Sequence, residues 1–358
     1  MKAAVWYKKR DVRIEDLPEP VPGKGEVKVR IKWCGICGSD LHEYLDGPIS
    51  IPVDAPHPLT GKTAPVTIGH EFAGEITEVG PDVTKFKVGD RVISETTLAC
   101  MECPECLAGN YSHCRNLGIL GISGFGGGLA EYTVAKELFL HKIPDEMGFE
   151  RAAIVEPLSV GFHSLTVGKF VPGMTAVVLG AGPIALGVIE SLRACGAKTI
   201  IAVVRKSIRQ EYALRSGADL VLDPNEVDAA AEIRRLTGDL GADICFETYG
   251  SELGPKIGQE CLRSGGTLVI ISLWSKPVPV DLMATVQGEY TIVGSNLFTY
   301  NDFETVKTML CDGRIKAEGY ITGRIALDDL LEEGFGALSG PDSKKHIKII
   351  VTPDRSLL

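Results

Sequence analysis

The sequence lacks any long apolar run, and no stretch approaches the roughly 20 apolar residues that a membrane-spanning helix needs. Residues 1–10 do not contain the apolar core of a secretory leader, and residues 355–358 do not match the peroxisomal tripeptide. Internal repeats and low-complexity linkers are also absent. These absences argue against a membrane protein or a repeat array, and we expect a globular protein of the cytoplasm.

Positive charge is scarce, since 37 lysines and arginines face 47 acidic residues and leave a net charge of -10. Such a balance argues against nucleic acid or an anionic membrane as the main partner. A length of 358 residues is more than one ordinary hydrophobic core accommodates, and it predicts two domains, or one domain with a large elaboration. A small-molecule ligand therefore fits the composition better than a polyanion does.

Cysteine is the residue type whose spacing is most informative. Four of the ten cysteines form the pattern Cys100-x-x-Cys103-x-x-Cys106-x7-Cys114. Thiols at these short gaps can all reach one tetrahedral zinc ion, whereas disulfides, the alternative, suit small secreted scaffolds. We therefore predict a zinc site with four thiolate ligands, which holds its loop together and performs no chemistry.

The hydrophobic pattern changes along the chain. In the first 150 residues, short alternating segments at 27–32, 75–80 and 90–93 predict half-buried β-strands between turns. After residue 174, continuous apolar strands alternate with helical segments, which predicts βαβ units and a parallel sheet. The strands are expected at 176–179, 199–204, 220–222, 243–246 and 266–271, and the helices at 183–195 and 207–216. A further helix after residue 302 and a strand at 346–351 complete the expected α/β protein.

A glycine-rich turn lies between the first of these strands and its helix. The segment Gly180-Ala181-Gly182-Pro183-Ile184-Ala185 matches the dinucleotide fingerprint G-x-G-x-x-G/A, with alanine in the third small position. The first glycine permits the tight turn, the second lets the pyrophosphate approach, and the helix N-terminus attracts the phosphate charge. The predicted cofactor contacts in the turn are Gly180, Gly182, Pro183 and Ile184.

The end of the second strand carries information about the cofactor. Enzymes that bind NAD through this turn end that strand with an acidic residue, which bonds the ribose 2′-hydroxyl. Val204 stands there instead, followed by Arg205 and Lys206, with Arg209 one turn further on. A solvated basic start of a helix is the alternative interpretation. Guanidinium groups attract a 2′-phosphate, so the sequence favours NADP(H), with NAD(H) possible.

Several segments together resemble the zinc-containing medium-chain dehydrogenase/reductase family, and within it the 2,3-butanediol dehydrogenases. The resemblance covers essentially the whole chain and is carried by residues 32–44, 56–60, 69–71, 155–160 and 332–338. Two positions depart from the family pattern. Ala185 stands where glycine is usual, which is a mild change, and Val204 stands where an acidic residue is usual.

The resemblance implies a second zinc per subunit, held by Cys37, His70 and Glu156, with a coordination position left open. It also implies that Ser39 accepts the proton of the alcohol and that His42 passes it to solvent. For His42 the alternative is an ordinary surface residue. Glu71 follows a ligand directly and is expected to orient the site or to approach the metal from outside its ligand set, the alternative being a pair with a nearby Arg or Lys.

The fold and activity that the resemblance implies are specific. A GroES-like β-barrel catalytic domain is expected at 1–155 and 298–358, with the structural zinc loop at 95–116, and a Rossmann domain at 156–297. The implied reaction is hydride transfer between a nicotinamide cofactor and a small secondary alcohol or ketone, foremost 2,3-butanediol and acetoin. A polyol dehydrogenase acting on sorbitol or xylitol is the alternative, and a non-catalytic relative is disfavoured because the zinc ligands are all present. Relatives are homodimers or homotetramers.

Overall fold

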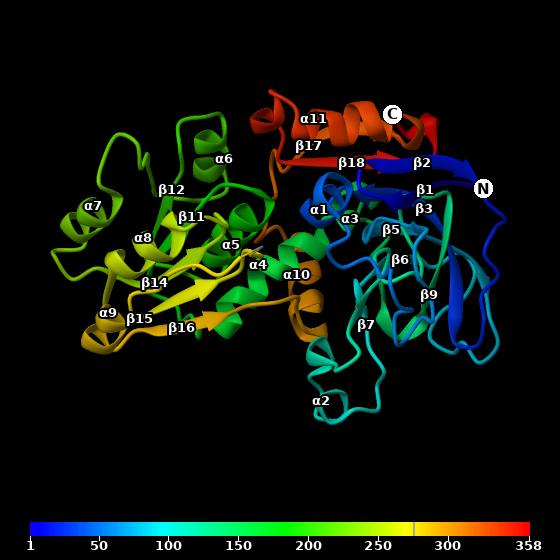
Figure 1. The fold of residues 1–358 in the computed structure, drawn as a ribbon, viewed down its shortest axis with the longest axis horizontal. Coiled ribbons are helices and arrows are strands. Elements are labelled where there is room, and N and C mark those ends of the chain that lie inside the picture. Colours follow the sequence, from blue (N-terminus) through cyan, green and yellow to red (C-terminus); the bar gives the residue numbers. More distant parts are fainter. Residues whose placement is uncertain (275) are drawn as a thin grey trace. The chain divides into compact units, whose positions relative to one another are not determined.

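The chain divides into two compact units in the computed structural model, which describes residues 1–274 and 276–358 (Figure 1). Unit 1 comprises Met1–Glu156 and Ile321–Leu358, and unit 2 comprises Pro157–Tyr320. Unit 1 is therefore built from both ends of the chain, with unit 2 inserted between its two segments.

Unit 1 consists mainly of antiparallel sheet. Its largest sheet has the order β10-β6-β5-β3-β18-β17, with β9 also paired to β3, and a smaller sheet has the order β2-β1-β4. Along β3, Val27, Val29 and Ile31 are buried between more exposed charged residues, which is the alternation that the sequence predicts. The strands of unit 1 are β1 (Lys2–Lys8), β2 (Asp11–Asp16), β3 (Glu26–Gly35), β4 (Val66–Thr67), β5 (Glu71–Val79), β6 (Arg91–Ser94), β7 (Thr97–Leu98), β8 (Gly118–Ile119), β9 (Tyr132–Lys136), β10 (Leu140–Lys142), β17 (Ile321–Ala326) and β18 (Lys348–Thr352).

Helices in unit 1 are short and lie in its connections. They are α1 (Gly38–Asp46), α2 (Pro104–Leu107), α3 (Phe149–Ala153) and α11 (Ala337–Ser339). A π-helical turn at Leu330–Gly336 precedes α11, and single 3-10 turns lie at Tyr111–His113, Glu137–Phe139, Leu327–Asp329, Ser343–Lys345 and Arg355–Leu357. The helix α1 matters most for the site, because it begins directly after Cys37.

Unit 2 is a doubly wound parallel sheet. Its six strands have the order β13-β12-β11-β14-β15-β16, so the strand order reverses beside β11, the first strand in the chain (Figure 1). This is the order of the Rossmann fold, and the predicted fold of this region is confirmed. The strands are β11 (Thr175–Leu179), β12 (Thr199–Val203), β13 (Leu220–Leu222), β14 (Ala242–Glu247), β15 (Leu262–Ile270) and β16 (Thr291–Gly294).

Apolar packing explains the sheet. Ala176, Val177, Val178 and Leu179 of β11 are all fully buried, as expected for a strand covered on both faces. Helices alternate with the strands, and α4 crosses the boundary between the units. The helices are α4 (Val155–Val167), α5 (Pro183–Ala194), α6 (Arg209–Arg215), α7 (Ala229–Leu236), α8 (Leu253–Cys261), α9 (Leu282–Gly288) and α10 (Tyr300–Cys311).

The segment 298–320 packs within unit 2, whereas the resemblance assigned it to the catalytic domain. Phe298 and Phe303 are fully buried with their ring centroids 5.2 Å apart. Asp302 of α10 lies 2.7 Å from Nδ1 of His163 on α4 and also accepts a hydrogen bond from Thr166. By packing, these buried contacts belong to unit 2, which ends at Tyr320.

The predicted elements that carry a clear hydrophobic period agree with the structure to within a few residues. The helix expected at 183–195 is α5, and the strand expected at 199–204 is β12. The sequence pattern did not reveal α4, α7, α8 and α9, nor β16 at the edge of the sheet. Among the described residues, no helix is long and apolar enough to cross a membrane.

Candidate active site and metal centres

The four cysteines of the spaced pattern converge in unit 1. Their four sulfur atoms all lie within 4.8 Å of one another. Cys100 Sγ is 3.5 Å from Cys114 Sγ and 3.9 Å from Cys106 Sγ. Sulfur atoms around a tetrahedral zinc ion lie at comparable separations, because each Zn–S bond is about 2.3 Å long. The four thiols fit one tetrahedral zinc ion and would fill all four of its coordination positions.

The local backbone explains how the loop brings the thiols together. The amide of Cys103 donates to Cys100 Sγ at 3.3 Å, and the amide of Cys100 donates to Cys114 Sγ at 3.3 Å. Hydrogen bonds from the backbone amides of Glu102 and Cys103 lower the pKa of the Cys100 thiol to about 7. These amides favour the zinc-binding thiolate at Cys100, whereas burial raises the pKa of the Cys106 thiol to about 12 and also raises that of Cys114.

A buried hydrogen-bond chain ties this loop to the large sheet, and the sequence analysis missed it. Tyr111, between the third and fourth cysteines, donates its hydroxyl to Glu95 Oε2 at 2.7 Å. The other oxygen of Glu95 lies 2.6 Å from Nε2 of His141, and both side chains are fully buried. No sequence pattern links these three residues, because strand pairing alone brings them together.

Three predicted residues of the second metal site lie at the start of α1 and just before β5. Cys37 is the N-cap residue of α1, and Ser39 lies in its first turn. Nε2 of the buried His70, the residue before β5, is 3.2 Å from Ser39 Oγ. The predicted ligand and the predicted proton acceptor are therefore neighbours, although 31 positions separate them in the sequence.

Asp40 is a further member of this site that the sequence analysis missed. Its Oδ2 accepts a hydrogen bond from the Cys37 amide at 3.0 Å, and its Oδ1 lies 3.5 Å from Nδ1 of His70. Metal-binding histidines usually direct their second nitrogen to a carboxylate, but among the described residues neither Asp40 Oδ1 nor His70 Nδ1 has a hydrogen-bond partner, so Asp40 lies near His70 without bonding to it. The signal in the sequence was the acidic residue three positions after the helix cap, which is typical of a capping box.

Glu156 reaches the same region from the first turn of α4. Burial raises the pKa of its carboxyl well above the usual value, and the charge of Glu71 raises it further, while His70 opposes the shift. Burial, followed by Glu71, also raises the pKa of the Cys37 thiol to about 12. Both groups are metal ligands only when ionised, and a divalent cation would supply the missing positive charge.

The donor set of Cys37, His70 and Glu156 therefore fits a zinc ion in its chemistry. The ligand atoms of this set are less closely clustered than the four sulfur atoms of the cysteine loop. Within the described ranges, the four cysteines are the only group of three or more His, Cys, Asp and Glu residues whose ligand atoms all lie within 4.8 Å of one another. Three protein ligands that leave one position open are typical of a zinc site that performs chemistry.

The two remaining predicted residues of this site have different surroundings. His42 is exposed on α1, where it can exchange protons with solvent. Glu71 is fully buried and forms an ion pair with Lys348, whose Nζ lies 2.6 Å and 2.7 Å from its two oxygens. The alternative interpretation of Glu71, a partner for a nearby cation, matches this contact, and the sequence analysis did not identify Lys348.

In unit 2, the glycine-rich turn connects β11 to α5 as predicted. Gly180 has a φ of +121°, and a Cβ there would lie 2.5 Å from Thr248 Oγ1, so only glycine fits. Nothing lies within 4 Å of a Cβ built on Gly182, which caps α5, and Pro183 and Ile184 form the first turn. The turn leaves the helix N-terminus open to an anionic group.

The end of β12 has the basic character that the sequence predicts. Val204 is buried, while Arg205 and Lys206 are exposed and Arg209 is half-buried at the start of α6. The nearest acidic group of the next strand is Asp223. Its two oxygens accept the amides of Lys206 at 2.7 Å and of Asn225 at 2.9 Å. Asp223 thus holds the loop in place.

Comparison with known proteins identifies the family. Residues 23–145 match the alcohol dehydrogenase GroES-like domain, and residues 183–311 match the zinc-binding dehydrogenase domain. The (R,R)-butanediol dehydrogenase of Bacillus subtilis is 44% identical over 99% of this chain and 100% of its own length, and that of Neisseria gonorrhoeae is 40% identical with the same coverage. The chain belongs to the zinc-binding alcohol dehydrogenase family.

Solved structures agree with this membership. The crystal structure of the Bacillus subtilis 2R,3R-butanediol dehydrogenase superposes with a TM-score of 0.93 and covers 99% of both chains. A sorbitol dehydrogenase of Bacillus subtilis is more distant, at 34% identity over 99% of this chain and 98% of its own. This zinc-binding dehydrogenase is therefore an NAD(P)-dependent alcohol dehydrogenase, and the predicted GroES-like and Rossmann folds are confirmed.

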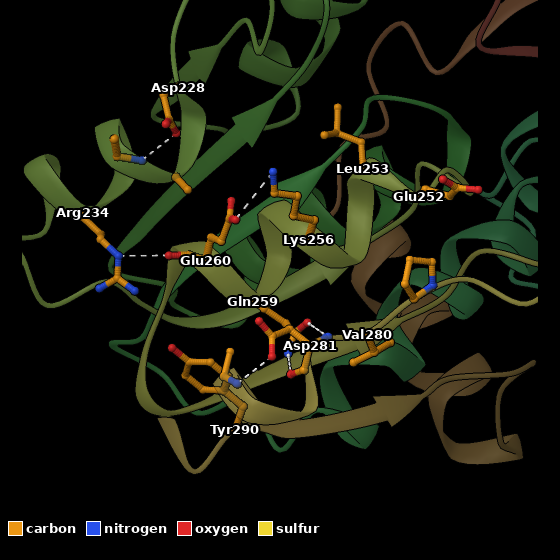
Figure 2. Close-up of a pocket in the computed structure, with 14 residues that line it drawn as sticks. Asp228, Arg234, Glu252, Leu253, Lys256, Gln259, Glu260, Val280, Asp281 and Tyr290 are labelled. Atoms are coloured by element: carbon orange, nitrogen blue, oxygen red, sulfur yellow. Dashed lines mark hydrogen bonds and ion pairs between the residues drawn. The ribbon is translucent and has the colours of Figure 1, made fainter. Parts of the chain in front are cut away.

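A hollow of the dehydrogenase lies elsewhere in unit 2. Its volume is about 1140 Å³, and α7, α8 and the segment 279–281 line most of it. Figure 2 shows Lys256 beside Glu260 and Arg234 bonded to the Glu260 backbone, so its charged side chains pair with neighbouring groups. None of the predicted site residues lines it, and we assign no chemistry to it.

The cysteine loop allows a direct test of its structural role. We expect Cys103→Ser to remove one zinc ion per chain and to lower the thermal midpoint by roughly 5–10 °C, because a closed zinc site contributes free energy to folding. Metal analysis and thermal unfolding measure the two effects. Cys311→Ser is the control, since that exposed cysteine lies outside both predicted sites. Unchanged stability and metal content in the Cys103 variant would refute the assignment.

Proposed function

We propose that this dehydrogenase interconverts 2,3-butanediol and acetoin by reversible hydride transfer with a nicotinamide cofactor. The observation that carries the proposal is the similarity to (R,R)-butanediol dehydrogenases over the full length of the chain, at 40–44% identity. Sorbitol dehydrogenases, which represent the alternative function, are more distant. The Cys37, His70 and Glu156 set supports either alcohol chemistry, so the site by itself does not separate the two.

In the proposed mechanism, the side chains of Cys37, His70 and Glu156 hold zinc, and Ser39 and His42 move the proton. Zinc, when bound, supplies a Lewis acid that favours loss of the alcohol proton. Ser39 is half-buried next to His70, and its Oγ would accept that proton while passing its own hydroxyl proton on toward His42. His42 is three residues further along α1, which places it on the same helix face as Ser39, and its exposed ring would release the proton to solvent.

A substrate panel tests the proposed function. We expect kcat/KM for 2,3-butanediol to exceed that for sorbitol and xylitol by at least about tenfold, because a pocket shaped for a short diol binds the transition state of a longer polyol less well. Steady-state assays in both directions, with chiral analysis of the product, make the measurement. A preference for sorbitol or xylitol would favour the alternative, and Cys37→Ala is the inactive control.

We also propose that the enzyme prefers NADP(H) to NAD(H). The proposal rests on the absence of a carboxylate at Val204 and on the exposed cationic side chains that follow it, with Asp223 bonded to the backbone of the same loop. A 2′-phosphate next to Arg205 would gain charge-assisted hydrogen bonds. The ribose of NAD(H) would find no acceptor at Val204.

Kinetics with both cofactors test this preference. We expect kcat/KM to be at least about tenfold higher with NADPH than with NADH, and Arg205→Ala to reduce the value for NADPH by about tenfold while leaving that for NADH nearly unchanged. Arg235→Ala is a matched control, since Arg235 is an exposed arginine of α7 paired with Glu232. A wild-type preference for NADH would overturn the proposal.

We propose further that two copies of the chain associate through the edge of the unit 2 sheet. Within the described part of the chain, the terminal strand β16 pairs only with β15, and three of its four residues are exposed. Exposed apolar side chains lie close to it in the sequence, among them Leu282, Met283 and Val286, which are 72%, 66% and 74% exposed. An open strand edge can pair with its own copy about a two-fold axis, which would also cover these side chains.

Sedimentation of matched variants tests the association. We expect the wild type to sediment as a dimer or tetramer and Val286→Lys to dissociate at the same concentration, because a charge in an apolar interface is costly. Leu240→Lys is the control, since Leu240 is 70% exposed in another part of unit 2. Dissociation of both variants, or of neither, would contradict the proposed surface.

We infer a reducing compartment, with the cytoplasm as the proposed location. All ten cysteines are free thiols, including the pair Cys245 and Cys261 in the core of unit 2. Proteins of oxidising compartments usually convert cysteines at this frequency into disulfides.

A further inference from the structure

Tyr249 follows β14, and its side chain crosses the end of the parallel sheet. Its hydroxyl donates a hydrogen bond to the carbonyl of Val203 at 2.5 Å, although 46 positions separate the two residues. Val203 is the last residue of β12, and β11 lies between β12 and β14. The ring is half-buried and packs against the apolar core of unit 2. The phenol therefore links the carboxyl ends of two strands that are not neighbours in the sheet.

The register of the sheet locates this side chain at the glycine-rich turn. Leu179, which ends β11, pairs with Val203 on one side and with Glu247 on the other. A side chain that runs from Tyr249 to Val203 therefore passes across the next residue, Gly180. A Cβ built on Gly180 would lie 3.6 Å from Cδ1 of the Tyr249 ring, which is ordinary van der Waals contact. Dinucleotides bind outside the carboxyl ends of the strands at this switch point, so the ring lies where the cofactor is expected.

Hydrogen bonds fix the backbone at both ends of the Tyr249 side chain. The buried carboxylate of Glu247 accepts the amides of Tyr249 at 2.7 Å and of Gly250 at 3.0 Å. At the other end, the carbonyl of Val203 accepts the amide of Gly180 at 3.0 Å in addition to the phenol. The phenol thus joins the end of β12 to the start of the glycine-rich turn.

Arg205 lies two residues after Val203 and has an exposed side chain. Its neighbour Lys206 lies 3.7 Å from Glu226, whereas Arg205 forms no ion pair within the part of the chain that the structure describes. The charge of Arg205 lowers the pKa of the Tyr249 hydroxyl, but burial raises that pKa by more. The hydroxyl therefore stays protonated and keeps donating at neutral pH, while the guanidinium near it is free to bind a phosphate.

We propose that Tyr249 is a positioning residue that sets Arg205 against the 2′-phosphate of NADP(H). It acts through the carbonyl of Val203, because its hydroxyl holds the end of β12 against the glycine-rich turn and so fixes the backbone from which Arg205 projects. An arginine on a fixed backbone loses less conformational entropy when it binds a phosphate than one on a loose loop. The inference rests on the proposed preference for NADP(H), and it adds a residue from a different strand to that preference.

Equilibrium binding of NADPH and NADH to purified full-length variants tests the proposal, with the fluorescence of the reduced nicotinamide as the signal. We expect Tyr249→Phe, which removes only the hydroxyl, to raise the Kd for NADPH about fivefold and to leave that for NADH within about twofold. In an Arg205→Ala background the same substitution should change neither Kd, because the group that Tyr249 positions is missing.

Two competitors isolate the adenosine end of the cofactor. Adenosine 2′,5′-bisphosphate carries the 2′-phosphate without a nicotinamide, and its binding to Tyr249→Phe should weaken by about the same fivefold factor. Binding of 5′-AMP, which has no 2′-phosphate, should stay unchanged. The comparison of two ligands within one variant cancels any general loss of folded protein.

Tyr290→Phe is the matched control. Tyr290 packs against the same core as Tyr249 but lines the hollow beside α8 (Figure 2). Removal of its hydroxyl should leave the ratio of the two dissociation constants at the wild-type value. Thermal unfolding of each variant shows that the fold is retained.

The proposal is wrong if Tyr249→Phe weakens NADPH and NADH equally, or weakens neither. It is also wrong if Tyr249→Phe still weakens NADPH fivefold in the Arg205→Ala background, because Tyr249 would then not act through Arg205. Failure of the proposed cofactor preference is distinguishable, since the wild type alone would bind NADH more tightly, and the role of Tyr249 would fall with it. Failure of the proposed alcohol substrate would appear as normal cofactor binding without turnover of 2,3-butanediol or acetoin.

Discussion

The proposed active site depends on the balance of charge among ionisable groups that have little access to water. Cys37, Asp40, Glu71 and Glu156 can all carry negative charge, and Lys348 is the single fully buried cation among the described residues. An isolated charge in such a place is costly, so each anion needs a partner or remains protonated. Lys348 compensates Glu71, and a divalent metal would compensate the Cys37 thiolate and Glu156. The ion pair and the ligand set therefore form one electrostatic system.

The cysteine loop solves the same problem in a simpler way. Its thiols receive hydrogen bonds from backbone amides of their own loop, as the contact from Cys103 to Cys100 shows. All its ligands come from one short segment, which makes a closed site that folding can build locally. The proposed catalytic site instead combines the cap of α1, the residue before β5 and the first turn of α4. Such a site depends on the whole of unit 1 being folded.

What the sequence could predict follows from this difference. The cysteine loop, the turn at Gly180 and the alternating strands and helices of unit 2 are local patterns, and each agrees in place with the structure. Lys348 lies 277 positions from Glu71, and only the pairing of β18 and β5 with β3 brings the two together. No spacing in one sequence reveals that contact. The ligand roles of Cys37, His70 and Glu156 came from resemblance to a family, and their chemistry in this chain stays a prediction.

The boundary predicted at residue 298 and the division by packing after residue 320 rest on different criteria. The predicted boundary came from the domain limits usual in the family that the sequence resembles. The division by packing depends instead on buried contacts, such as the one between Asp302 and His163. The sequence itself shows that Val204 stands where an acidic residue is usual. The sequence does not show the role of Asp223, because it depends on the hydrogen bonds of a loop from the neighbouring strand.

The discontinuity of unit 1 has a consequence for the order in which the protein is synthesised. A ribosome completes β3 and β5 long before it reaches β18, and the whole of unit 2 is made in between. During that interval one side of β3 has no strand at Gly35, and Glu71 has no lysine beside it. Binding of β18, which is made after unit 2, closes the sheet and introduces the positive charge. The proposed active site is thus completed only after the nucleotide-binding fold has had time to form.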